Sequence, residues 1–297
     1  MTRVESYSSL ATLASCAEKY RLSYVERLEE PETVAQTNGK AMHAAANVLY
    51  VGGFDAGRVE AAKEAALAAW GETRSGLASK KPWLTKGFLE ARIEAYVEER
   101  TRRPTMLEEA EVVAAYAEEM HVFDWSGPRG LVRVRGMPDL VVRSGGKTFV
   151  VDHKFPTSGY LTDFYFLRFS LGFQLRIYAA MYQNLTGEVV AGGFINAVSC
   201  GEKSVDPPEK WKTRKSAPSA LRRIDFTQEQ IADAHVWADG LLRQRDFHAS
   251  VGLWPRNEAG CDDMGGCAYV GLCAAPSEGV RKAMMMTGFK RKEEEER

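Results

Sequence analysis

The most regular pattern of hydrophobic and polar positions in the chain covers residues 131–154, which read LVRVRGMPDLVVRSGGKTFVVDHK. Two apolar, β-branched runs flank the glycine pair 145–146. Such a pair predicts a two-residue hairpin turn, because a type I′ turn needs positive φ at both central positions. In this register Asp139 falls directly opposite Asp152. Pro138 cannot donate a hydrogen bond to a strand ladder, so it predicts an edge position or a bulge there.

Directly opposed residues of an antiparallel pair point to the same face of a sheet. The face that reads as core carries Leu140, Val142, Phe149 and Val151. The opposite face carries Asp139, Asp152 and Lys154, and we expect Arg133 and Arg135 beside them. Opposed carboxylates repel, so a divalent cation with hard oxygen ligands is their natural partner, and Lys154 can neutralise part of the remaining charge. A surface hairpin with solvated acids is the alternative.

Helical periodicity predicts most of the other elements. Helices are expected over residues 8–26, 38–49, 59–73, 86–103, 163–185 and 227–245. Strands are expected over residues 111–125 and 188–197, and the basic, proline-containing stretch 201–223 is expected to be a loop. Gln174 and Tyr178 are four residues apart in a predicted helix, so both lie on one helical face.

Length, composition and charge narrow the possible classes of protein. The chain has 297 residues, enough for one large domain or two small ones, and 45% of them are apolar. The 39 basic residues balance 40 acidic ones, so net charge does not indicate a strongly basic nucleic-acid binder. A local basic groove would still be sufficient at a site where metal ions supply positive charge. No membrane-spanning stretch or signal peptide is evident, so we expect a cytoplasmic protein with no membrane partner.

The five cysteines suggest a metal or cluster site. Their odd number argues against a secreted disulfide framework. Cys261, Cys267 and Cys273 cluster among glycines near the C-terminus. Three thiolates are one short of the usual four, and Cys16 in the first predicted helix is the obvious fourth ligand. Cys200 then remains as a buried or half-buried free thiol.

Three short motifs together carry a family resemblance. A G-x-x-D motif ends at Asp139, a D-x-K motif begins at Asp152, and a Q-x-x-x-Y motif begins at Gln174. This combination resembles the PD-(D/E)XK nuclease superfamily, and within it the RecB-like branch. That branch also carries an upstream histidine on a helix, which here would be His43 in the stretch GKAMHAA. The resemblance implies an α/β, restriction-endonuclease-like core, in which helices flank a mixed central sheet.

The resemblance also implies a metal-dependent site. The expected ligands of one or two Mg²⁺ or Mn²⁺ ions are His43, Asp139, Asp152 and the backbone carbonyl of His153. Lys154 would orient the attacking water and offset negative charge in the transition state. Gln174 and Tyr178 would position the substrate strand or support Lys154.

The cysteine pattern resembles the iron–sulfur staple of RecB-like nucleases such as AddB-type and CRISPR adaptation nucleases. In those proteins one cysteine before the nuclease core joins three after it to hold a [4Fe-4S] cluster. The segment from Cys267 to Cys273 matches the C-x-Y-x-x-x-C end of that pattern. The spacing between Cys261 and Cys267 is longer than the family's usual spacing, so zinc is the alternative to the cluster at this site.

The implied function is a metal-dependent deoxyribonuclease, an exonuclease on single-stranded DNA ends in repair, recombination or phage DNA processing. The chain carries no G-x-x-x-x-G-K-[ST] phosphate loop, so a helicase or recombination partner would supply any motor. We expect one nuclease domain over residues 1–297, a helical insertion at 51–108, and a cysteine segment at 254–275 that closes onto Cys16. The rival functions are a catalytically idle DNA-binding subunit of a recombination complex and a zinc-stapled interaction protein.

Other side chains could contact DNA. Arg100, Arg102 and Arg103 form a basic run that either faces phosphates or is simply solvated. Most aromatic residues between Phe155 and Phe173 read as core, but Tyr160 or Tyr165 could stack on unpaired bases. The sequence does not choose between these alternatives.

Overall fold

The structure is a computed structural model of the whole chain. It describes residues 4–30, 33–70, 82–115, 121–127, 130–157, 161–206, 218–261 and 266–291. The chain forms two compact units. The first contains Met1–Pro31, Ser126–Val134 and His235–Arg297, and the second contains Glu32–Trp125 and Arg135–Ala234. The prediction of one nuclease domain over residues 1–297 stays a prediction.

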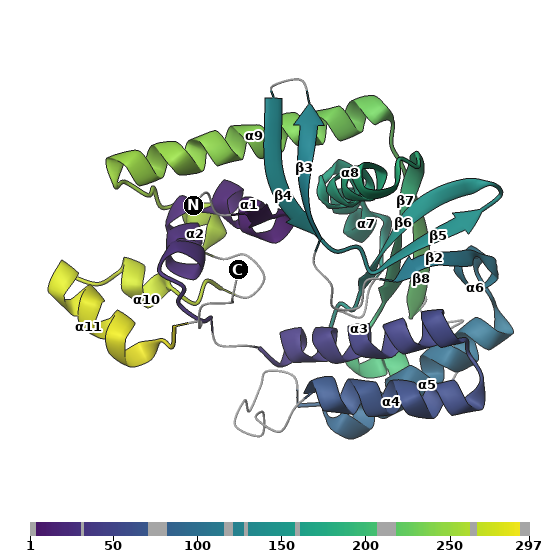
Figure 1. Ribbon diagram of the computed structural model, residues 1–297. Coiled ribbons are helices and arrows are strands. Elements are labelled where there is room, and N and C mark those ends of the chain that lie inside the picture. Colours follow the sequence, from purple (N-terminus) through teal and green to yellow (C-terminus); the bar gives the residue numbers. More distant parts are fainter. Residues whose placement is uncertain are drawn as a thin grey trace. The chain divides into compact units, whose positions relative to one another are not determined.

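A five-stranded sheet forms the centre of the second unit (Figure 1), in the order β2-β5-β6-β7-β8. Its strands are β2 (Glu111–Ala115), β5 (Leu140–Ser144), β6 (Lys147–Lys154), β7 (Val190–Val198) and β8 (Ser219–Asp225). Only β6 and β7 run parallel, and the other neighbours are antiparallel. The mixed sheet with flanking helices confirms the predicted α/β, restriction-endonuclease-like fold.

The β5–β6 hairpin has the predicted turn and register. Gly145 and Gly146 have φ values of 56° and 71°, a backbone conformation that favours glycine at both positions. Ser144 pairs with Lys147, and Leu140 pairs with Val151. The side chains predicted as core are buried.

The predicted strand 131–144 is interrupted at Pro138. Its first part is β4 (Gly130–Gly136), which lies in a separate three-stranded sheet with β1 (Glu5–Ser6) and β3 (His121–Gly127). Arg133 and Arg135 are in β4, so the expectation that they share the aspartate face of the hairpin was wrong. A proline offers no N–H to a ladder and fixes its own φ, which accounts for the break.

Helices cover both faces of the central sheet (Figure 1). On one face α3 (Val34–Gly52), α4 (Ala56–Trp70) and α5 (Lys86–Arg102) share a hydrophobic core with the sheet. On the other face lie α7 (Asp163–Leu171) and α8 (Gln174–Thr186), and Leu175 of α8 lies directly over Gly193 of β7. The short helices α6 (Met106–Glu109) and η2 (Glu202–Val205) complete this unit.

Several predicted elements differ from the structure. The helix predicted over 163–185 is two helices, because the backbone is extended at Gly172. The strand predicted over 111–125 is two strands, β2 and β3. The predicted loop 201–223 includes the start of β8, and its residues 207–217 lie outside the described residues. The expected insertion 51–108 includes α4 to α6, and its residues 71–81 also lie outside the described part.

The first unit joins the two ends of the chain. Its N-terminal elements are α1 (Tyr7–Ser15), α2 (Ala17–Tyr20) and the π-helical turn η1 (Arg21–Val25), so the helix predicted over 8–26 is broken at Cys16. Its C-terminal elements are η4 (Glu258–Gly260), α10 (Val270–Cys273) and α11 (Glu278–Gly288), which follow the long helix α9 (Gln228–Val251). The hydroxyl of Tyr269 donates a 2.8 Å hydrogen bond to the carbonyl of Leu28.

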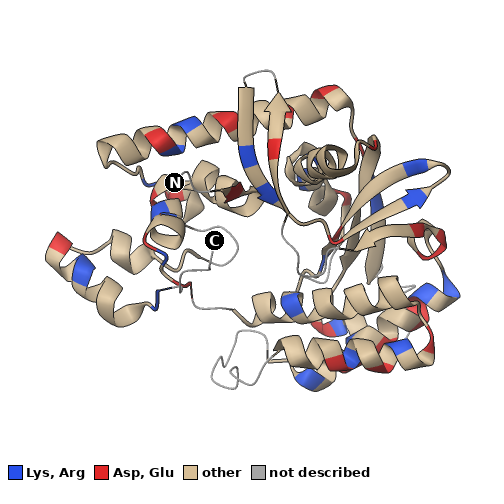
Figure 2. Ribbon diagram, viewed as in Figure 1, with Lys and Arg blue, Asp and Glu red and all other residues tan. Residues whose placement is uncertain are grey.

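Acidic and basic residues alternate along the exposed helices. Figure 2 shows both charge signs interspersed on α4, α5 and α9. None of the helices in the described ranges is both long enough and apolar enough to cross a membrane.

Candidate active site

Asp139 and Asp152 stand at the open end of the β5–β6 hairpin. Extending the observed register by one residue beyond the Leu140–Val151 pair places the two aspartates opposite each other. Asp139 Oδ2 accepts a hydrogen bond from the backbone N–H of His153 at 2.5 Å. This bond holds the Asp139 carboxylate against β6.

The D-x-K motif lies on β6, where residues two apart share a face. Lys154 Nζ therefore reaches Asp152 Oδ2 at 2.6 Å. The side chain of Asp152 is only 5% exposed, whereas that of Lys154 is 24% exposed. The Asp152 carboxylate is thus sequestered from water, and the Lys154 side chain that contacts it is partly exposed.

Helix α3 supplies His43. It begins at Val34, four residues before the predicted start at Asn38, and Thr33 and Gln36 form a capping box at its N-terminus. Nδ1 of His43 lies 3.1 Å from Asp139 Oδ1, and the side chain of His43 is 39% exposed. Its ring meets Phe155 edge to face, with 4.9 Å between ring centroids. The upstream histidine predicted for the site is therefore in contact with the first aspartate.

Helix α8 supplies Gln174 and Tyr178 on one helical face, as predicted. Gln174 Nε2 donates to the Tyr178 hydroxyl at 3.0 Å and lies 3.5 Å from Asp152 Oδ1. The glycine of the G-x-x-D motif permits this close packing, because a Cβ at Gly136 would lie 3.3 Å from the Tyr178 ring. The amide thus links α8 to the more deeply buried aspartate.

The charges of the site form two pairs. Burial disfavours the charged form of His43, but the adjacent Asp139 outweighs burial and raises the pKa of His43 above its usual value. Burial likewise opposes ionisation of Asp139, yet His43 holds the pKa of Asp139 below its usual range. Burial raises the pKa of Asp152 despite Lys154. Burial opposes the charge of Lys154, and Asp152 outweighs it and raises the pKa of Lys154.

Behind the aspartates lies a buried polar network that sequence reasoning missed. Its centre is Asn196 on β7, whose side-chain amide lies 2.9 Å from Nδ1 of His153. The same amide donates to the hydroxyls of Tyr50 and Tyr96, and its carbonyl accepts from Arg100 at 3.1 Å. Arg100 is therefore buried in this network, so the interpretation of it as a phosphate-facing or solvated residue was wrong.

The buried surroundings also determine the protonation state of His153. Burial lowers the pKa of His153 to about 4, so its ring is neutral at physiological pH. Nδ1 of this ring faces the NH₂ group of Asn196, whose two hydrogens are shared among Nδ1 and the hydroxyls of Tyr50 and Tyr96. The resemblance assigned only the backbone carbonyl of His153. The sequence signal that could have revealed the network was Asn196, a polar residue within a predicted apolar strand.

A family comparison decides the identity of this arrangement. A model of the PD-(D/E)XK nuclease superfamily matches residues 5–274, which include all the residues of this site. This chain belongs to the PD-(D/E)XK nuclease superfamily. Membership implies a hydrolytic nuclease with DNA as substrate.

Comparison with solved structures shows only distant similarity to this nuclease. A candidate exonuclease from Eubacterium rectale is 12% identical, with 86% of this chain and 85% of that chain covered and a TM-score of 0.47. The protein SSO0001 is 15% identical, with 89% of this chain and 95% of that chain covered and a TM-score of 0.32. No curated protein matches the chain.

The donor chemistry of the nuclease site fits Mg²⁺ or Mn²⁺. Two carboxylates, one imidazole and a backbone carbonyl form an oxygen-rich set of the kind these ions prefer. Across the described residues, no group of three or more His, Cys, Asp or Glu side chains is already arranged to hold an ion. Lys154 and His43 contact the carboxylates instead. The candidate ligands lie close together, and a bound ion would replace these contacts.

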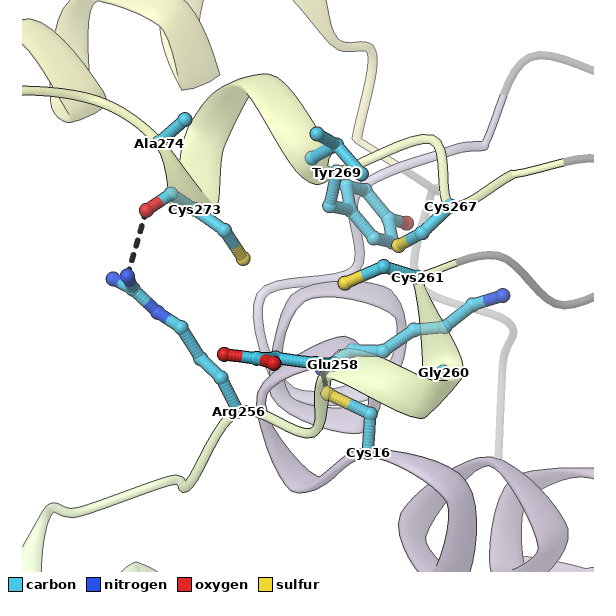
Figure 3. A pocket seen from close by; sticks show the side chains of 11 residues that line it. Cys16, Arg256, Glu258, Gly260, Cys261, Cys267, Tyr269, Cys273 and Ala274 are labelled. Atoms are coloured by element: carbon cyan, nitrogen blue, oxygen red, sulfur yellow. Dashed lines mark hydrogen bonds between the residues drawn. The ribbon is translucent and has the colours of Figure 1, made fainter.

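The four cysteines predicted as cluster ligands meet around one cavity in the first unit. This cavity has a volume of about 320 Å³ and is lined by Cys16, Cys261, Cys267 and Cys273. Figure 3 shows them arranged around it, with Arg256 and Glu258 at its edge. Burial raises the pKa of Cys273 despite the nearby Arg256. Cys200, predicted as the spare thiol, is buried in the second unit.

Proposed function

We propose that this nuclease is a divalent-metal-dependent deoxyribonuclease that removes nucleotides from single-stranded DNA ends. The observation that carries the proposal is the pairing of Asp139 with His43 and of Asp152 with Lys154 at one end of the β5–β6 hairpin. An idle binding subunit has no need to keep opposed acids, which repel each other unless cations lie among them. Repair, recombination or phage DNA processing, with a helicase or recombination partner, is the proposed setting.

Each side chain has a role that follows from its position. Mg²⁺ or Mn²⁺, when held by Asp139, Asp152, His43 and the carbonyl of His153, would activate water and polarise the scissile phosphate. Lys154 keeps its proton beside Asp152, so it can orient the water and offset charge that develops on the phosphate. Gln174 and Tyr178 would position the strand or support Lys154.

The cavity of four cysteines supports the second part of the proposal, a RecB-like branch with a [4Fe-4S] staple. Four thiolates are the usual ligand set of such a cluster, and Cys16 comes from the N-terminal helices while the other three follow α9. The bound group would tie the two ends of the chain together. Anaerobic purification with iron, sulfide and zinc analysis tests it.

That analysis has a matched control within the chain. Iron and acid-labile sulfide in wild type and in Cys200→Ala, with loss of both in Cys267→Ser, would support a cluster. Stoichiometric zinc without sulfide would contradict the cluster and replace it with a zinc staple.

The nuclease activity is tested on matched linear and circular single-stranded DNA. End-labelled linear DNA and a circle of the same sequence are incubated with Mg²⁺, Mn²⁺ or chelator. We expect metal-dependent loss of the linear substrate and survival of the circle. Cutting of the circle would contradict exonuclease action. Absence of cleavage with every metal, together with intact DNA binding, would contradict the enzyme and favour the idle subunit.

A further inference from the structure

Helix α7 presents a stripe of apolar side chains to solvent. Phe164, Leu167 and Leu171 are 85%, 49% and 68% exposed. Their spacing places them on one side of the helix. The buried Phe166 anchors the opposite side, and the guanidinium of Arg222 lies 5.1 Å from its ring centroid. The exposed side of α7 is therefore not the side by which the helix is held.

The stripe is continuous with the candidate active site. One step around the helix from Phe164 come Tyr165 and Phe169, whose rings contact each other at 5.4 Å between centroids. Lys154 Nζ lies 5.9 Å from the Phe169 centroid. The charges of Lys154 and Asp152 also act on the Tyr165 hydroxyl. A ligand that leaves the aspartates over this helix would therefore reach the apolar stripe directly.

Arg168 lies between the site-facing rings and the exposed stripe. Its guanidinium carbon is 4.5 Å from the Tyr165 centroid and 4.6 Å from the Phe169 centroid. Within the described ranges it forms no ion pair with a carboxylate. A guanidinium packed against two adjacent rings is restricted in position, and its planar N–H groups suit a bidentate contact with a phosphate.

We propose that α7 is the platform for the unpaired strand of the DNA substrate, with a base stacked on Phe164 and a phosphate bound by Arg168. This inference rests on the proposed nuclease function and assigns the surface on which its single-stranded substrate lies. Aromatic rings next to cations are the usual surface for unpaired bases, because every base offers a flat face and every linkage a phosphate. A duplex hides its base faces and would leave the stripe unused.

A protein partner is the competing occupant, and the size of the surface disfavours it. A stable protein interface buries about 800 Å² on each side, which one stripe of three side chains cannot provide. Arg168 is the one basic residue of α7, which suits a phosphate rather than an acidic protein surface. Of the aromatic residues suggested from sequence, Tyr165 holds Arg168, and Tyr160 lies outside the described residues.

The test is the fluorescence of an oligonucleotide that carries 2-aminopurine, which is quenched when the base stacks. Binding is measured in chelator, so that it does not depend on cleavage. Wild type should quench the probe, Phe164→Ala should weaken binding roughly tenfold and lose the quenching, and Phe164→Trp should restore both. Phe247→Ala, which removes another exposed phenylalanine on α9, should behave as wild type.

Arg168→Ala provides the second readout. It should weaken binding and reduce the dependence of affinity on salt concentration by about one released counterion, because one phosphate contact is lost. With Mg²⁺ or Mn²⁺, both α7 variants should raise KM for single-stranded DNA more than they lower kcat.

The outcomes separate this inference from the proposed function. Wild type that binds and quenches the probe but never cleaves would overturn the nuclease proposal and leave the platform supported. Wild type that cleaves, with Phe164→Ala equal to it in affinity and quenching, would overturn the platform and leave the nuclease supported. A Phe164→Ala variant that changes oligomeric state while it binds DNA normally would also overturn the platform, in favour of a protein interface.

Discussion

The aspartate site of the second unit and the cysteine cavity of the first unit are held by different means. The aspartates lie at the ends of paired strands, and ion pairs and a buried network hold the surrounding side chains. The cysteines lie at short helices and turns around a cavity. One of them, Cys16, accepts a 3.5 Å hydrogen bond through Sγ from the backbone N–H of Lys19. The aspartate site is therefore built from paired strands and buried polar contacts, whereas the proposed cysteine site is built from short elements that a bound group would tie together.

A large effect should come from the cation of the aspartate site. Lys154→Ala should lower the rate of cleavage by roughly 100-fold to 1,000-fold, as loss of one preorganised charge does. DNA binding should persist in the folded variant. Single-turnover cleavage and filter binding measure the two quantities. A variant with the wild-type rate would remove Lys154 from the site.

The next effect should distinguish the two sites by stability. Removal of the proposed cysteine-bound group, by Cys267→Ser or by oxidation, should lower Tm by roughly 5–10 °C, because binding of such a group would contribute to folding. Proteolysis should then begin in the first unit. Chelation of Mg²⁺ or Mn²⁺ should leave Tm nearly unchanged.

Differential scanning fluorimetry and limited proteolysis record both effects, with Cys200→Ala as the control. A large Tm loss on chelation of Mg²⁺ or Mn²⁺, with none in Cys267→Ser, would reverse the comparison between the two sites.

A smaller effect should follow from opening the buried network. Asn196→Ala removes the amide that joins His153, Tyr50 and Tyr96, and it leaves buried polar groups without partners. We expect a loss of about 2–3 kcal/mol in the free energy of unfolding, measured with urea. Asn184→Ala, which removes an exposed amide contact to the Asp124 carbonyl, should cost less than about 1 kcal/mol. Equal losses in both variants would mean that the network adds nothing to stability.

The smallest effect should be the pH dependence of the His43–Asp139 pair. Because the pKa of His43 is raised on folding, the pair contributes stability below the unfolded pKa of histidine, about 6.5, and loses it as pH rises through the folded value. Asp139 stays ionised over this range, since its pKa is lowered. Wild type should exceed His43→Gln in unfolding free energy at pH 5.5, and the difference should shrink at pH 8.5. A difference in unfolding free energy that grows with pH would contradict a stabilising interaction between His43 and Asp139.

Local patterns in the sequence were sufficient to predict how the residues at the centre of the aspartate site are arranged. The glycine pair 145–146 requires one turn, and strand alternation then places Asp139 opposite Asp152 with no further information. Helical spacing likewise predicts that Gln174 and Tyr178 act together. These inferences succeed because each depends on contacts within one hairpin or one helix.

Contacts between segments that are distant in the chain could not be predicted from the sequence. Asn196 joins the D-x-K strand to α3 and α5, and its partners are far apart in the chain. Strand β8 was missed because its basic, alternating residues look like a loop until β7 is present beside it. The breaks at Cys16 and Gly172 fall inside stretches whose helical periodicity continues past them.

The most direct test of the central claim compares wild type with Asp152→Asn in single-turnover cleavage of end-labelled single-stranded DNA with Mn²⁺. Asp225→Asn, which alters an exposed carboxylate on β8, is the matched control. The account predicts that wild type and Asp225→Asn cleave alike, while Asp152→Asn binds the DNA with similar affinity and does not cleave it. Cleavage by Asp152→Asn at the wild-type rate would show that the aspartate site is not the catalytic site.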